Sequence, residues 1–369
     1  MDLKILSANM RRIRNATSMS QKALAVASGI SLPSIKNIES GKNEPRLNSL
    51  QAIAGALKVN LQDLFMNVRI LQTVRFRSRK QMQNRENILA DIGHRLDDFN
   101  YLEETLNDKI PFKLREARKK CSSKEVEKAA QICRQCLGLK DGEPIRDICG
   151  LFEHAGIKMF SLKNASDGFY GLSVGEEDGG PAIVVNTWDR ISVERQIFSA
   201  AHELGHLMLH KDAYDVNNVD ENKAEEQQAD LFAGHFIMPD NGFLKEWDEA
   251  SGLHPVDRVF KVKHIFHVSY KVVLNRLLEK GKVDKYVWPK FNLSYNKRYG
   301  RKLLYKVEPM GIESAEPFGL DKFVFYEDRF SKLVRQALES DKISLSRGAE
   351  LLRKSISELQ ELIVQWKML

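Results

Sequence analysis

Apolar residues recur at helical spacing through the first 66 residues, in short blocks separated by serine, glycine and proline. This spacing predicts a small N-terminal domain of five helices over residues 1–66. The segment carries nine Lys and Arg against four Asp and Glu. The N-terminal part of the chain is therefore helical and basic.

A basic strand and a long helix are predicted next, over residues 67–109. Residues 74–78 (VRFRS) alternate apolar and basic side chains, which is typical of a strand. Apolar residues then lie three or four positions apart on one stripe, which predicts one amphipathic helix: Ile88, Ile92, Leu96, Phe99, Leu102 and Leu106. This helix could serve as a spacer or dimer seam, or as a core helix of the following domain.

Residues 110–290 mix the two patterns, because strand-like segments at 160–187 are flanked by helical ones. In residues 291–369 the pattern is mixed at first and then predicts three short helices. Ser355 and Glu358 form a capping-box pair before the last of them. The fold class predicted is multidomain and mainly α, with an α+β central domain around a small sheet.

Composition narrows the possible classes of protein. The 369 residues exceed one ordinary domain, and 43% hydrophobic with 29% charged residues is typical of a globular protein. No apolar run approaches the roughly 18–20 residues that span a bilayer, and the N-terminus lacks a secretory signal pattern. Four cysteines exclude a disulfide scaffold and fit a reducing, cytoplasmic location. A net charge of +7 permits binding to nucleic acid.

Residues 20–41 have the layout of a helix-turn-helix. Ser20 can cap the first helix, and Gly29 suits a tight turn with positive φ. Ser31 can cap the second helix, with Pro33 in its first turn, where a missing N–H costs nothing. If the isoleucines of that helix face inward, four side chains remain for the major groove: Leu32, Ser34, Lys36 and Asn37.

Residues 5–66 resemble the Cro/C1-type (XRE) helix-turn-helix family, through the Ser-Gln pair, the Gly-Ile-Ser turn and the closing LQAIAGALKVNLQDLF. The resemblance implies that Glu39 holds the domain together and that dimers bind double-stranded operator DNA. It assigns phosphate or outer-base contacts to Gln21 and phosphate contacts to Lys36 and Lys42. Its groove-facing positions are Leu32, Pro33, Ser34 and Asn37. The alternative is a helical module that binds protein instead of DNA.

The segment AAHELGHLMLH (200–210) indicates a metal site. His202 and His206 are four residues apart, so on a helix both imidazoles point the same way and can share one Zn²⁺. Glu203 is placed to take a proton from a metal-bound water. Glu226 is the predicted third ligand, because it lies in an otherwise buried helical stripe where a carboxylate needs a partner. Glu225 is the second choice.

These residues resemble the ImmA/IrrE-type metallopeptidases, together with EPIRDICGLFEHAGIKMF, DGFYG and the E-x-x-A-D-x-F-A…MP pattern of 226–239. The resemblance implies a two-lobed, zincin-like α+β domain with Glu203 as general base. AIVVN (182–186) is expected at the sheet edge, along which a substrate strand could lie. Candidates for stabilising the oxyanion remain open: His210, Tyr214 and His235.

Three weaker patterns have less specific interpretations. Cys133 and Cys136 could bind a metal with Cys121 and Cys149, although cysteines in such a helix usually pack as small hydrophobes. The basic stretch 75–85 could contact phosphates or form a solvated surface. The C-terminal helices could be a second helix-turn-helix-like fold or a dimerisation module.

Together these features predict a bacterial or phage transcriptional repressor that acts near its own gene as a homodimer. Its zinc metallo-endopeptidase domain would relieve repression by cleaving a partner protein or the chain itself, within 67–90. In the alternative, the peptidase-like domain is non-catalytic and binds a toxin or a small molecule, as in an antitoxin or a ligand sensor. A third possibility is a plain protease with an incidental helical domain.

Overall fold

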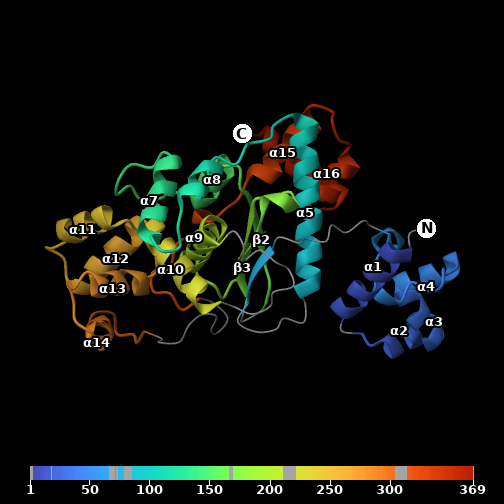
Figure 1. Ribbon diagram of the computed structural model, residues 1–369, viewed down its shortest axis with the longest axis horizontal. Helices are drawn as coiled ribbons and strands as arrows, with labels where there is room; N and C mark the ends of the chain where they lie inside the picture. The colour runs from blue at the N-terminus through green and yellow to red at the C-terminus, as the bar shows by residue number, and fades with distance from the viewer. Residues whose placement is uncertain are drawn as a thin grey trace. The chain divides into compact units, whose positions relative to one another are not determined.

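The computed structural model describes residues 3–17, 19–65, 71, 74–78, 85–165, 169–210, 222–303 and 314–368. The chain divides into two compact units, Met1–Leu71 with Lys80–Asp98 and Gln72–Arg79 with Phe99–Leu369 (Figure 1). The long helix α5 (Arg85–Leu106) contributes to both units.

The first unit begins with four α-helices and a short 3-10 helix: α1 (Leu3–Ala16), α2 (Gln21–Ser28), α3 (Leu32–Glu39), α4 (Leu47–Leu57) and η1 (Leu61–Leu64). The predicted caps are confirmed, because Ser20 accepts from the Ala23 N–H and Ser31 accepts from the Ser34 N–H. Gly29 has φ +68°, as the turn requires. The predicted fifth helix is the single 3-10 turn η1.

The apolar stripe of α5 is buried within the chain. The five buried side chains are 0–5% exposed: Ile88, Ile92, Leu96, Phe99 and Leu102. A stripe that one chain covers by itself is the property of a core helix. The stripe is therefore core in both units: Ile88, Ile92 and Leu96 belong to the first unit, and Phe99 and Leu102 belong to the second.

Four strands form the sheet of the second unit: β1 (Val74–Ser78), β2 (Lys158–Leu162), β3 (Phe169–Val174) and β4 (Ala182–Asn186). Their order is β1-β3-β4-β2, with β2 parallel to β4 and the other pairs antiparallel. The prediction that AIVVN forms a sheet edge is wrong, since β4 lies between β3 and β2. Its unbroken run of apolar side chains fits a strand that is buried on both faces.

Helices cover both faces of this sheet (Figure 1). Helices α9 (Val193–Leu209) and α10 (Lys223–Ile237) lie together on one face, where α9 packs on β3 and β4. On the other face Phe160 of β2 meets Phe99 of α5 edge-on, with ring centroids 5.9 Å apart. Phe99 also contacts Phe330 of α15 (Arg329–Glu339), so the first of the C-terminal helices packs on the sheet unit.

The remaining elements of the second unit are short helices: α6 (Arg115–Lys120), α7 (Val126–Cys136), α8 (Ile148–His154), η2 (Glu176–Asp178), α11 (Asp240–Glu249), α12 (Pro255–Phe266), α13 (Tyr270–Glu279), α14 (Val287–Tyr299), η4 (Lys322–Val324), α16 (Leu345–Leu351) and α17 (Ile356–Lys367). Helix α14 runs across residues 290 and 291, where the sequence suggested a domain boundary, and buries Phe291 and Tyr295. The three predicted C-terminal helices and the Ser355–Glu358 capping box are confirmed.

A buried carboxyl group makes the stability of this unit depend on pH. Glu153 on α8 is 4% exposed, and burial, with Asp328 nearby, raises its pKa to about 8. An unfolded glutamate titrates near 4.3. The folded chain therefore holds this proton more tightly, and the stability that protonation contributes is lost as pH rises toward 8.

We expect Glu153→Gln to remove this loss, because the amide never ionises. Between pH 6 and pH 9 the wild type should lose about 2–3 kcal/mol more unfolding free energy than the variant. Urea denaturation at both pH values measures the difference. Glu116→Gln, at a side chain 74% exposed, is the control and should behave as wild type. Equal pH dependence in wild type and Glu153→Gln would contradict the expectation.

Candidate metal centre and nucleic-acid interface

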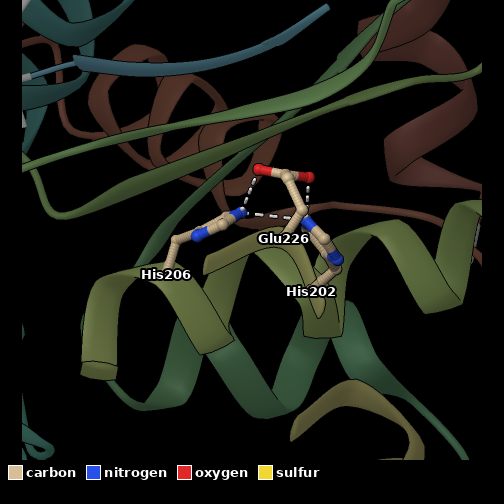
Figure 2. A group of neighbouring side chains, drawn as sticks. All are labelled: His202, His206 and Glu226. Carbon is tan, nitrogen blue, oxygen red and sulfur yellow. Dashed lines mark hydrogen bonds and ion pairs between the residues drawn. The ribbon is translucent and has the colours of Figure 1, made fainter. Parts of the chain in front are cut away.

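Helix α9 brings the two predicted histidine ligands together. His202 and His206 are fully buried, one turn apart, on the side of α9 that faces α10. Their Nε2 atoms lie 2.9 Å apart, so both rings present the same nitrogen to one point (Figure 2). The i,i+4 spacing of a regular helix is sufficient to produce this arrangement.

Glu226 on α10 supplies the third group. Its Oε2 lies 3.2 Å from Nε2 of His202, and its Oε1 lies 3.2 Å from Nε2 of His206 (Figure 2). Tetrahedral zinc with bonds of 2.0–2.1 Å separates its ligand atoms by about 3.3–3.4 Å. The observed separations of 2.9–3.2 Å are close to that value, so the donor set fits Zn²⁺. Glu225 is not part of this group and contacts Arg75 instead.

The protonation of these groups suits a cation. Burial lowers the pKa of His206 well below its usual value, which keeps the imidazole neutral. Burial alone would raise the pKa of Glu226, but hydrogen bonds with His202 and His206 outweigh it and lower the pKa. A neutral imidazole and an ionised carboxylate are the forms that bind metal.

Glu203, the predicted general base, lies on α9 between the histidines and is fully buried. Its Oε2 accepts a hydrogen bond of 2.9 Å from the Ser173 hydroxyl of β3. A Cβ at Gly171 would lie 3.2 Å from the Glu203 side chain and 2.9 Å from the Val184 carbonyl. Glycine at 171 therefore leaves the room in which the carboxylate lies against the sheet.

Several contacts around the site escaped sequence reasoning. Asp230, one turn after Glu226, lies 2.8 Å from Nδ1 of His202 and can fix the orientation of that ring. Arg75 of β1 contacts the carboxylates of Glu225 and Glu226. Only Asp230 had a sequence signal, because it falls within the pattern of 226–239.

The structure assigns no oxyanion role to the described candidates. His210 lies against His206, with Nδ1 atoms 2.9 Å apart, and its other nitrogen meets Gln228. His235 lies in a separate cluster with Glu127 and Asp240. In that cluster Nη1 of Arg276 lies 3.0 Å from Nε2 of His235. The guanidinium is itself a cation and occupies the position that a metal ion would need. Tyr214 falls outside the described residues.

The cysteines form no metal cluster among the described residues. Cys133 is buried on α7, and a hydrogen bond with Cys121, with burial, raises its pKa well above the usual value. Cys136 is exposed and Cys149 is buried. The buried cysteines therefore pack as small hydrophobes.

On α3 of the helix-turn-helix, Ile35 and Ile38 face the core, as predicted. Three of the predicted DNA-contact residues are exposed: Pro33, Lys36 and Lys42. Three others are half-buried: Leu32, Ser34 and Asn37. The Ser34 hydroxyl hydrogen-bonds the Ser31 hydroxyl at 2.8 Å.

Glu39 joins the first three helices of this domain. It is 2% exposed and accepts from Arg14 Nε at 2.5 Å. It also accepts from the Gln21 side-chain amide at 2.6 Å. The amide nitrogen of Gln21, predicted to meet DNA, is therefore engaged within the domain.

Comparison with protein families agrees with this division. A family model described as an IrrE N-terminal-like domain matches residues 152–278, which include α9, α10 and strands β2–β4. A helix-turn-helix model matches residues 10–64. The chain thus joins an XRE-type helix-turn-helix domain to an ImmA/IrrE-like, metallopeptidase-type domain. A search of curated proteins returned no match. Among the residues that the structure describes, no helix is both long and apolar enough to cross a bilayer.

The Asp230 contact gives a test of the metal site that leaves its three ligands intact. We expect Asp230→Ala to weaken zinc binding about 10–100-fold, because the His202 ring loses its orienting carboxylate. Competition with a zinc-indicator dye measures the affinity. Asp248→Ala on α11, at a side chain 66% exposed, is the matched control. Equal affinities in both variants would show that Asp230 has no such effect.

Proposed function

We propose that this chain is a DNA-binding transcriptional repressor whose zinc metallopeptidase-like domain relieves repression by cleaving the chain itself or a partner protein. The convergence of His202, His206 and Glu226 at one buried point, with Glu203 on the same helix, carries the proposal. A helix-turn-helix domain in the same chain supplies the means of binding an operator.

The chemistry proposed is peptide hydrolysis. Zinc held by the three ligands would polarise a peptide carbonyl and acidify a water. Glu203 takes the proton of that water as its oxygen attacks the carbonyl carbon, while the Ser173 hydroxyl keeps the carboxylate in position. Glu203 then gives the proton to the amide nitrogen as the C–N bond breaks.

The DNA-binding part rests on the outer side of α3. Asn37 and Ser34 offer hydrogen-bonding groups to base edges, and Leu32 and Pro33 offer apolar contact to thymine methyl groups. The exposed Lys36 and Lys42 meet phosphates. Two such domains, in a homodimer, would read two half-sites of an operator.

Cleavage in the chain itself would separate the two functions. Residues 67–90 lie between the two family matches, so a cut there would break the chain connection between the DNA-binding helices and the metallopeptidase-like domain. Cleavage of a partner repressor is the other outcome that the same site supports.

A non-catalytic function is the second candidate. A cleft of about 490 Å³ adjoins α9, α10 and α13, and Asp230 lines it. Since Asp230 also contacts His202, a small molecule or a segment of a toxin bound there would act on the metal site without any turnover. This arrangement favours a ligand sensor or an antitoxin.

Glu203→Gln separates the two candidates. It should keep about one zinc per chain, because the ligands are intact, whereas His202→Ala should lose it. Cleavage and derepression of a reporter under the chain's own promoter should fall at least 100-fold in Glu203→Gln, because the base is lost. Zinc is measured by elemental analysis. Derepression that persists in Glu203→Gln would favour the binding function.

DNA recognition is tested on a duplex from the region upstream of the chain's own gene. Asn37→Ala should weaken binding by about 1–3 kcal/mol and relax sequence preference. Lys36→Ala should reduce the magnitude of the slope of log affinity against log salt concentration by about 1, because one phosphate contact is lost. Lys128→Ala, at an exposed lysine of α7, is the control. If DNA affinity is unchanged by both substitutions and by salt concentration, the helical domain would instead be incidental to a plain protease.

A further inference from the structure

Strand β3 contacts the candidate base, Glu203. Ser173 of β3 donates to Glu203, and Gly171 of the same strand makes room for that side chain. An extended peptide that pairs with this edge would pass beside the metal site with its backbone fixed by the ladder. A peptide paired with the edge of β3 would therefore lie beside the strand that positions Glu203.

The opposite edge of the sheet is closed by a side chain. The N–H and the hydroxyl of Ser161 on β2 donate to the Glu327 carboxylate, at 3.0 and 2.6 Å. Strand β4 also separates β2 from β3. It cannot bring a peptide to Glu203.

In this structure the chain's own strand β1 occupies the β3 edge. The pair is antiparallel, with Val74 opposite Val174 and Arg75 opposite Ser173. Strand β1 comes from the segment between the two family matches and lies outside both. It pairs with β3 through the backbone positions that a bound peptide would use.

Arg75 anchors this strand to the metal site. Its side chain is 11% exposed and contacts the carboxylates of Glu225 and Glu226 on α10. The distance from Nη2 to Oε1 of Glu226 is 3.4 Å. Two carboxylates that face one guanidinium form a site with preference for arginine at the position opposite Ser173.

We propose that the β3 edge is a peptide-binding site for an extended segment with arginine opposite Ser173, and that Val74–Ser78 is its resident ligand in cis. The resident strand excludes other peptides until it is withdrawn. The proposal deepens the proposed function by naming its substrate class and a block on it. Strand binding itself requires neither zinc nor cleavage, so its test stands even if the peptidase function fails.

The test measures whether a peptide in trans competes with β1. A fluorescent peptide of residues 72–80 (QTVRFRSRK) is titrated with the full chain, and binding is followed by anisotropy. Arg75→Glu places a third carboxylate beside Glu225 and Glu226, which should loosen β1 and strengthen peptide binding at least tenfold over wild type. Arg115→Glu, which breaks the exposed pair with Glu176, is the charge-matched control and should bind as wild type.

Two peptide controls establish specificity. A scrambled peptide of the same composition, and a peptide with glutamate in place of arginine at the position of Arg75, should show no gain. Equal binding of QTVRFRSRK to wild type and Arg75→Glu would overturn the proposal, because β1 would not be in competition with it.

A second variant decides the question if Arg75→Glu fails to fold. Val74→Cys with Val174→Cys places two thiols on directly opposed positions of β1 and β3. When oxidised, the disulfide holds β1 in place, and peptide binding should disappear. When reduced, binding should return to at least the wild-type level. Equal binding in both redox states, with the single-cysteine variants as controls, would also overturn the proposal.

Discussion

The close approach of α9 and α10 at Gly205 brings the three candidate metal ligands together. A Cβ at Gly205 would lie 3.1 Å from the ring of Phe232 and 3.3 Å from the Cα of Ala229. Glycine therefore lets α10 pack at this distance without a shift of Phe232 or of the α10 backbone. Gly205 lies between His202 and His206 on α9, and Glu226 lies one turn before Ala229 on α10. A Cβ at this position would require Phe232 or the backbone of α10 to give by a few tenths of an ångström, and any shift of α10 would change the 3.2 Å distances from the carboxylate to both imidazoles.

The part of the site that the sequence predicted is the part set by local geometry. His202 and His206 follow from helical periodicity, and Glu226 follows from the cost of an isolated buried carboxylate. Ser173 and Arg75 could not be predicted in this way. Ser173 reaches the site because β3 packs on α9, and Arg75 reaches it because β1 pairs with β3, which joins residues about one hundred positions apart. AIVVN was expected at the sheet edge, and this prediction failed because the place of a strand inside a sheet depends on strand order, which the local sequence does not encode.

The helix-turn-helix shows the same division between local and tertiary signals. Its caps, its turn glycine and the inward isoleucines are local features, and the structure confirms them. Gln21 is different, because a polar residue in the first turn of a helix can face DNA or its own domain. Glu39 decides between these: it is buried, and a buried carboxylate needs donors, which Arg14 and Gln21 supply. The contact that orders the domain thus also fixes how Gln21 can approach a phosphate.

One oxygen atom links the resident strand to the metal centre. Oε1 of Glu226 lies 3.2 Å from Nε2 of His206 and 3.4 Å from Nη2 of Arg75. A metal cation held by the two histidines would share the Glu226 carboxylate with the guanidinium of Arg75. Each positive group would then weaken the attraction between that carboxylate and the other positive group. Linkage is reciprocal, so a metal bound at the proposed site would loosen β1 by the same factor by which β1 weakens its binding. The joining segment and the metal centre are then one coupled system, in which loading the site and freeing the β3 edge favour each other.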